Sequence, residues 1–180
     1  MELNRKAAHD VTAEELIQQF SAPDGRRRQR ARAALVALGH EATAALLTAL
    51  DDPNWRVRWE AAKTLSEIAD PSAIDPLVAA LRDDDPEIRW LAGDALIATG
   101  PRCLVPLLHA LVAHSDRTQF RQAAHFVLRG LEGRMGSGTL QPVLGALTGI
   151  EPSIEAPIAA LETLGRLDNP RTQGARSTGS

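Results

Sequence analysis

Apolar residues recur along this chain at three- and four-residue spacing, which places them on one face of a helix. Val57, Ala61, Leu65 and Ile68 follow this spacing, with polar and charged residues among the positions between them. One apolar face per helix is typical of an amphipathic helix that packs against its neighbours. The same pattern predicts helices at 12–20, 26–38, 41–50, 54–69, 72–82, 86–99, 102–113, 117–131, 139–147 and 155–167.

Turn and capping residues separate these segments. Thr12 and Glu15 have the spacing of a capping box, and Gly39 follows the second segment as a C-cap would. Asp-Pro pairs and an aspartate run at 83–85 interrupt the middle of the chain. The segments therefore alternate as a short helix, a polar turn and a longer helix. We call the first helix of each pair A and the second B.

The helix pairs repeat in sequence as well as in pattern. Arg58, Trp59, Ala61 and Leu65 return 31 residues later as Arg89, Trp90, Ala92 and Leu96. A period of this size indicates stacked helix pairs. We therefore expect an all-α fold, an α-solenoid of about five pairs in one domain over 1–170, with a disordered polar tail at 171–180. The predicted repeats are about 12–39, 41–70, 72–100, 101–133 and 138–169.

The recurring motif consists of Asp-Pro, then Val or Ile with Arg, then Ala-Ala or Ala-Gly, then Leu. This motif resembles HEAT repeats, in particular the bacterial HEAT-like type named after phycobilin lyases. It is strong in the second and third pairs, whereas in the fifth pair Pro157 holds the place of the arginine. The resemblance implies that the B helices line a concave surface. It also implies that the arginines bridge to acids of their own or a neighbouring repeat.

The repeated arginines form an Arg ladder, one near the start of each of the first four B helices: Arg28, Arg58, Arg89 and Arg121. The preceding turns offer Asp24, Asp52, Asp85 and Asp116 as partners. A planar guanidinium can hold a carboxylate with two parallel hydrogen bonds, so the ladder is expected to fix how the repeats stack. The alternative is a row of anion-binding sites.

Residues beside the ladder are the candidates for a binding surface. If Val57, Ala61 and Leu65 are buried, Trp59 cannot face the same core. Tryptophan is enriched at binding hot spots, and Trp59 and Trp90 occupy equivalent places on adjacent helices. The alternative is that both indoles brace neighbouring repeats. The full set of predicted partner-binding residues is Trp59, Trp90, Glu60, Lys63, Leu91, Asp94, Arg30, Gln122 and Phe126.

Composition narrows the function classes. The 180 residues are 44% hydrophobic but 3% aromatic, and the net charge of −3 gives no global attraction to nucleic acid or anionic membranes. Cys103 is alone, so it has no internal disulfide partner, and no apolar run approaches the roughly 20 residues of a membrane helix. We expect a cytoplasmic protein without membrane contact. Its histidines show no metal-ligand spacing, so no metal and no cofactor are expected.

These observations favour a non-catalytic protein-interaction scaffold, a monomer or weak dimer that binds another protein on the concave face of its B helices. One alternative is a chaperone-like or lyase-associated subunit acting on a tetrapyrrole-carrying protein, with Trp59 and Trp90 contacting the chromophore. A further alternative is nucleic-acid binding through the basic cluster Arg26–Arg32, or a HEAT-like DNA glycosylase using Trp90 and Asp94. Few phosphate-binding cations are available, so nucleic acid is an unlikely partner.

Overall fold

The structure is a computed structural model that describes residues 11–135 and 138–168. Every regular element within these ranges is a helix, so the predicted all-α fold is confirmed. The tail predicted at 171–180 lies outside the described residues. The α-helices are α1 (Ala13–Gln18), α2 (Gly25–Leu38), α3 (Thr43–Ala49), α4 (Trp55–Ile68), α5 (Ile74–Ala80), α6 (Pro86–Thr99), α7 (Leu104–His114), α8 (Thr118–Met135), α9 (Gln141–Leu147) and α10 (Pro152–Asp168). Short 3-10 helices connect several of them: η1 (Gln19–Ser21), η2 (Gly39–Ala42), η3 (Pro71–Ala73) and η4 (Gly100–Cys103).

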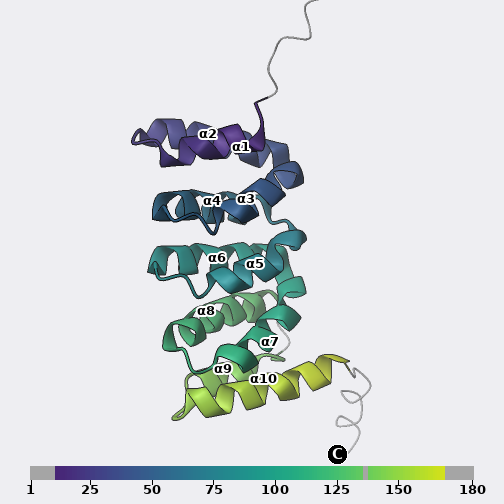
Figure 1. Ribbon diagram of the computed structural model, residues 1–180. Coiled ribbons are helices and arrows are strands. Elements are labelled where there is room, and N and C mark those ends of the chain that lie inside the picture. The colour runs from purple at the N-terminus through teal and green to yellow at the C-terminus, as the bar shows by residue number, and fades with distance from the viewer. Residues whose placement is uncertain (1–10, 136–137, 169–180) are drawn as a thin grey trace, which may run out of the picture.

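The helix pairs stack as successive layers, from α1 and α2 at one end to α9 and α10 at the other (Figure 1). The B helices α2, α4, α6 and α8 pack one against the next in a continuous row. The A helices α1, α3, α5 and α7 lie beside them. This arrangement is the predicted solenoid, and it presents the same side of every B helix along one surface.

Side-chain caps start the first helix and the first three B helices. The capping box of α1 is present, since Thr12 and Glu15 each accept the other's backbone N–H. Asp24, Asn54 and Asp85 accept the amide two residues later at the starts of α2, α4 and α6. Asp85 followed by Pro86 at the first helical position is the predicted arrangement. Before α4, however, Asn54 is the cap, while Asp52 stabilises the turn by accepting from the Asn54 amide.

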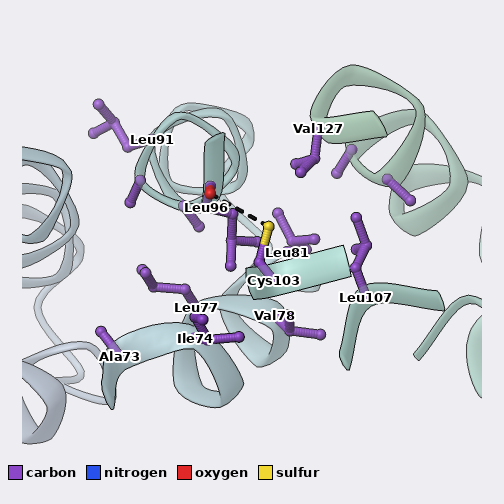
Figure 2. Close-up of a cluster of buried hydrophobic side chains, with 14 of the residues drawn as sticks. Ala73, Ile74, Leu77, Val78, Leu81, Leu91, Leu96, Cys103, Leu107 and Val127 are labelled. Carbon is purple, nitrogen blue, oxygen red and sulfur yellow. Dashed lines mark hydrogen bonds between the residues drawn. The ribbon is translucent and has the colours of Figure 1, made fainter. Parts of the chain in front are cut away.

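The core lies between the two rows and is built mainly from Ala, Leu, Ile and Val. Figure 2 shows part of it, where Leu77 of α5 and Leu81, which directly follows α5, lie with Leu96 of α6 and Leu107 of α7. Cys103 is fully buried in this cluster, and its thiol contacts the carbonyl oxygen of Leu96 at 3.3 Å. The stretch Pro86–His114 is long and apolar enough to cross a membrane by composition. In this fold it is two helices, α6 and α7, joined by η4 and packed into the core.

The last pair reverses the order of the others. Helix α9, the first of its pair, packs against the B helix α8, whereas α10 packs against the A helix α7 and against α9. Figure 1 shows α10 lying directly below α7 at the end of the stack. The helix expected at 155–167 is therefore present and longer than predicted, but it covers the A row. The B-helix surface consequently ends at α8.

Candidate functional site

The Arg ladder holds the turns between A and B helices. In each of the four repeats the ladder guanidinium donates from Nη1 to the backbone carbonyl six residues earlier. For Arg58 these acceptors are Asp52 O at 2.9 Å and Pro53 O at 3.3 Å. The carbonyls belong to turn residues that no helix hydrogen bond satisfies. The ladder therefore fixes each turn to the start of its own B helix.

Two ladder arginines also reach the next repeat. Arg58 binds Asp83 with two hydrogen bonds, Nε to Oδ2 at 2.8 Å and Nη2 to Oδ1 at 3.2 Å. Arg28 donates from Nε to Glu60 Oε1 at 3.0 Å. The predicted role in repeat stacking thus has a geometric basis. The carboxylate partners, however, come from the following repeat, whereas Asp24, Asp52, Asp85 and Asp116 had been expected to supply them.

Glu60 is a buried charge, which differs from the surface position expected for it. Its side chain is 5% exposed and accepts from Arg28 and from Arg32, whose Nη1 lies 2.7 Å from Oε2. The neighbouring helix α2 covers this position, so Glu60 belongs to the interface between the first two repeats. Leu91 is also buried, at 3% exposure, and lines the floor of a cleft.

That cleft is an apolar hollow on the B-helix face. Trp59 of α4 and Trp90 of α6 line it together with Pro86, Glu87 and Leu91, and its volume is about 320 Å³. Trp59 is half-buried, and its indole N–H donates to Glu87 Oε2 at 3.0 Å. Trp90 is 54% exposed. The two predicted anchor residues therefore share one cleft, which the pattern of the sequence did not by itself establish.

Phe126 extends the aromatic surface onto α8. Its ring centroid lies 6.0 Å from that of Trp90, within the range for favourable aromatic pairs. Gly93 makes this approach possible, because a Cβ at that position would lie 2.9 Å from the Phe126 ring. The row Trp59, Trp90 and Phe126 crosses three consecutive B helices. We call these three residues the aromatic row.

The remaining predicted residues surround the aromatic row at the surface. Arg30 and Gln122 are exposed, and Lys63 and Asp94 are half-buried. The basic cluster is divided by its contacts, since Arg28 and Arg32 bind Glu60 and Arg27 contacts Gln19. Two of its five arginines are thus committed to a buried carboxylate. This arrangement weakens the case for a phosphate-binding patch there.

A second apolar surface was missed by the sequence interpretation. Ile154, Ile158 and Leu161 of α10 are each more than half exposed, and Ile150 beside them is 95% exposed. Their spacing places the three helical residues on one side of α10. Residues Ala156, Ala160 and Leu164 of the same helix are buried. The signal was present in the sequence as a second apolar stripe, which we call the α10 stripe.

The single thiol is not placed for surface chemistry. Cys103 is fully buried, and burial raises the pKa of its thiol above the usual value. Raising the pKa lowers the fraction of the nucleophilic thiolate at neutral pH. Among residues 11–135 and 138–168, no cluster of His, Cys, Asp and Glu side chains is arranged to hold a metal ion. Any chemistry on the B-helix face therefore involves residues other than Cys103.

Comparison with known proteins relates this architecture to a family. Residues 13–97 match the family of HEAT repeats. A segment of 67 residues is 45% identical to phycocyanobilin lyase subunit beta of Nostoc sp. strain PCC 7120, covering 37% of this chain and 34% of that protein. The match therefore spans about a third of the length of this curated relative.

A solved structure supports the same relationship over more of the chain. The complex of CpcE and CpcF of phycocyanin lyase from Nostoc sp. PCC7120 contains a chain that is similar with a TM-score of 0.57 and 26% identity. The similarity covers 84% of this protein and 97% of that chain. These relatives correct one expectation: a protein without a part in enzyme chemistry was predicted, whereas the related chains are subunits of a lyase.

Proposed function

From the premise that this chain is a HEAT-repeat protein related to phycocyanobilin lyase subunits, we propose that it is a subunit of a bilin lyase complex acting on a tetrapyrrole-carrying protein. The cleft between Trp59 and Trp90 would receive the tetrapyrrole chromophore. The relatives support the class of reaction, and the aromatic row supplies a surface suited to a flat conjugated molecule. The scaffold function expected from the sequence is contained in this proposal, because a lyase subunit must bind other proteins.

The exposure of Trp90 is the observation that carries the proposal. An indole that is more than half exposed next to an apolar cleft leaves a large apolar area in contact with water. Its covering by a planar ligand would remove that area from water and stack two π systems. The Glu87 carboxylate, held by the Trp59 indole, adds an acceptor for pyrrole N–H groups at the rim.

A cleft of about 320 Å³ would hold part of an open-chain tetrapyrrole and leave the rest accessible. This partial burial suits a protein that passes its ligand on, since the rest of the chromophore stays accessible to an acceptor protein. The described residues do not include an exposed cysteine. We therefore propose that the chromophore is held at the aromatic row by non-covalent contacts.

We further propose that the α10 stripe is the contact surface for a second lyase subunit of HEAT type. The similar solved chain comes from a complex of two subunits. The stripe lies on the last described helix of the stack, so another helical layer could continue the packing there. Ile154→Asp and Ile158→Asp would place charges in this contact and should abolish association with the second subunit, measured by co-purification. Association unchanged in both variants would rule out this surface.

The chromophore proposal is tested by titrating the protein with phycocyanobilin while recording tryptophan fluorescence and bilin absorbance. We expect saturable quenching, and Trp90→Ala should weaken binding by about tenfold, which corresponds to about 1.4 kcal/mol. Trp55→Ala is the matched control, because Trp55 is similarly exposed but does not line the cleft. Equal effects of the Trp55 and Trp90 substitutions, or no saturable quenching, would refute the proposal.

A further inference from the structure

Arg89 lacks the carboxylate partner that the two preceding ladder arginines, Arg28 and Arg58, possess. Arg28 binds Glu60 and Arg58 binds Asp83 in the following repeat. Arg89 donates from Nη1 to the carbonyls of Asp83 at 2.7 Å and Asp84 at 3.0 Å. No carboxylate within the described part of the chain contacts its guanidinium. The Nε and Nη2 donors of Arg89 are therefore available to an acceptor from outside.

The fourth repeat has a neutral residue at the position from which the third repeat supplies the partner of Arg58. Asp83 and Ser115 are equivalent positions, because each gives its backbone carbonyl to the ladder arginine of its own repeat, Arg89 and Arg121 respectively. Asp83 serves Arg58 of the preceding repeat. Ser115 stands where the corresponding partner of Arg89 would be. A short neutral side chain thus replaces the expected carboxylate.

The same turn also has a cation where the third repeat has an aspartate. Asp85 and Arg117 are equivalent, because their carbonyls accept the backbone N–H of the ladder residues Arg89 and Arg121. Asp85 caps α6 with its carboxylate, whereas Arg117 brings a positive charge to the start of α8. Cations at a helix N-terminus oppose the helix dipole. A locally unfavourable residue of this kind is often retained for function.

These departures converge on one pocket. A pocket of about 230 Å³ is lined by Arg82, Arg89 and Arg117, with Phe120 of the first turn of α8 in its wall. Asp83 and Asp84 also line it, but Asp83 is already bound by Arg58. Arg82 donates to His114 Nε2 at 3.3 Å, and the Arg117 side chain makes no hydrogen bond or ion pair to any described residue. Three arginines therefore line the pocket together with one carboxylate, that of Asp84, which pairs with no other described side chain.

We propose that this pocket binds a carboxylate group of a ligand, taking the place that Asp83 occupies beside Arg58. The anion matches what this protein's own arginines bind in the first two repeats, and a planar carboxylate can accept from Nε and Nη2 of Arg89 in parallel. The volume suits a carboxylate on a short alkyl chain. Two sources have this chemistry, the propionate groups of a tetrapyrrole and an acidic side chain of a partner protein.

The groove next to the pocket allows such a ligand to be larger than its carboxylate. A groove of about 540 Å³ shares Arg82, Asp83 and Arg117 with the pocket, and Leu47 and Leu50 line its far part. A ligand with an apolar body and an acidic arm would therefore have contacts in both hollows. The pocket itself does not depend on the proposed lyase function, because simple carboxylates suffice to test it.

The test is a titration of the full chain with glutarate, with sodium chloride at matched ionic strength as the reference, followed by thermal unfolding. We expect a saturable rise in Tm with glutarate that chloride does not reproduce. Arg117→Gln should weaken glutarate binding by about tenfold, the effect of losing one charge-assisted hydrogen bond. Arg102→Gln, an exposed arginine outside the pocket, should leave glutarate binding unchanged.

Ser115→Asp is a more specific test, because it places a carboxylate of the chain itself at the position equivalent to Asp83, within reach of Arg89. We expect it to raise the Tm of the free protein and to abolish the response to glutarate. A wild-type response that persists unchanged in Ser115→Asp, or a wild-type protein with no saturable response, would overturn the proposal. If Ser115→Asp folds normally and still responds to glutarate as the wild type does, glutarate binds at another site.

Two further titrations distinguish the sources of the carboxylate. Biliverdin and its dimethyl ester differ only in free propionates, and a peptide of three glutamates supplies acidic side chains without a tetrapyrrole. If biliverdin binds more tightly than its dimethyl ester, and Ser115→Asp abolishes this difference, the carboxylate comes from a tetrapyrrole. If Ser115→Asp weakens binding of the peptide alone, the carboxylate comes from a partner protein. If Ser115→Asp changes the binding of neither ligand, the site is refuted. Trp90→Ala leaves the glutarate titration intact, so failure of the proposed function and failure of this site are separable.

Discussion

Arg58 and Asp83 join the second and third repeats through two parallel hydrogen bonds, at 2.8 Å and 3.2 Å, between side chains that are 19% and 12% exposed. The same guanidinium holds the turn of its own repeat through the carbonyls of Asp52 and Pro53. One side chain therefore couples the shape of a turn to the spacing of two layers. Asp83 raises the pKa of Arg58 further, chiefly through the hydrogen bond, so the charge is retained throughout the accessible pH range.

The Arg58–Asp83 pair should contribute measurably to stability. Asp83→Asn keeps the volume but removes the charge, and we expect it to lower the free energy of unfolding by about 2 kcal/mol. Urea unfolding followed by circular dichroism measures this loss. Glu162→Gln is the control, because the Glu162–Arg166 pair is mostly exposed and should contribute less than about 1 kcal/mol. Equal losses in the two variants would contradict the structural role assigned to the pair.

Glu60 should be the more costly carboxylate to remove. Truncation to alanine leaves Arg28 and Arg32 without their shared, nearly buried partner, and we expect a loss of about 3 kcal/mol in the free energy of unfolding. Glu67→Ala removes a more exposed carboxylate that lies 3.6 Å from Arg32 and should have a much smaller effect. If Glu60→Ala unfolds at the same urea concentration as the wild type, Glu60 does not stabilise the contact between the first two repeats.

Gly93 is required by the close approach of α6 and α8. A methyl group there would displace the Phe126 ring, which it would meet at 2.9 Å, and we expect Gly93→Ala to destabilise the protein by about 1–2 kcal/mol. Because Phe126 contacts Trp90, tryptophan fluorescence should shift as well. Gly165→Ala is a matched helical control with open space around it, and it should stabilise by about 0.5–1 kcal/mol. A stabilising Gly93→Ala would show that the packing around Phe126 is loose.

Thr43 and Asp70 provide a pH-dependent link between the start and the end of the second repeat. The Thr43 hydroxyl donates to Asp70 Oδ2 at 2.7 Å and is the main reason that the pKa of Asp70 lies below its ordinary value. A lowered carboxyl pKa stabilises the folded state above the unfolded pKa, near 3.9, and this contribution is lost as the pH falls through the folded pKa. We expect Thr43→Val to cost about 1 kcal/mol at pH 7 and progressively less in acid.

Unfolding curves of wild type and Thr43→Val between pH 7 and pH 2.5 test this expectation. Thr48→Val serves as the control, because the Thr48 hydroxyl bonds only to a carbonyl within its own helix and is exposed. A stability difference between wild type and Thr43→Val that stays constant over this range would contradict the assigned titration.

Cys103 should be inert in the folded protein. Its thiol is buried beside the Leu96 carbonyl and has a raised pKa, so we expect negligible reaction with DTNB at pH 8 until the chain unfolds. A Ser72→Cys thiol at an exposed position should react at once under the same conditions. Rapid modification of the wild type would show that the core around α7 opens readily.

The sequence predicted most of the fold because each repeat carries its own helical pattern. The B helices, the capping residues and the four ladder arginines all follow from spacing within a single repeat. The carboxylate partners did not, since they depend on which residue of the next layer comes within reach. Glu60 illustrates this limit: relative to its own repeat it points away from the core, yet α2 of the preceding repeat covers it.

The reversed packing of the last pair was not predicted, for a different reason. Helix α10 has two apolar stripes, one with Ala160 and Leu164 and the other with Ile154 and Ile158, and a periodic pattern does not say which stripe packs inward. The expectation of a non-catalytic scaffold was wrong because it rested on the absence of familiar catalytic motifs, whereas the relatives support the lyase-associated alternative. Subunits of a lyase need not each carry such a motif, and the lyase-associated alternative already assigned Trp59 and Trp90 to contact with a chromophore.

The packing of α10 on α7 also determines the order in which the chain can complete its structure. In the first layers each helix contacts close neighbours in sequence, so every pair can fold soon after it is synthesised. Helix α7 must instead wait for α10, which follows it by the whole length of α8 and α9. During synthesis on the ribosome, the face of α7 that packs on α10 therefore stays exposed until α10, which begins at residue 152, has emerged. The fourth layer is therefore the part of the stack whose apolar surface waits longest for its covering helix, and apolar surface exposed during folding favours aggregation.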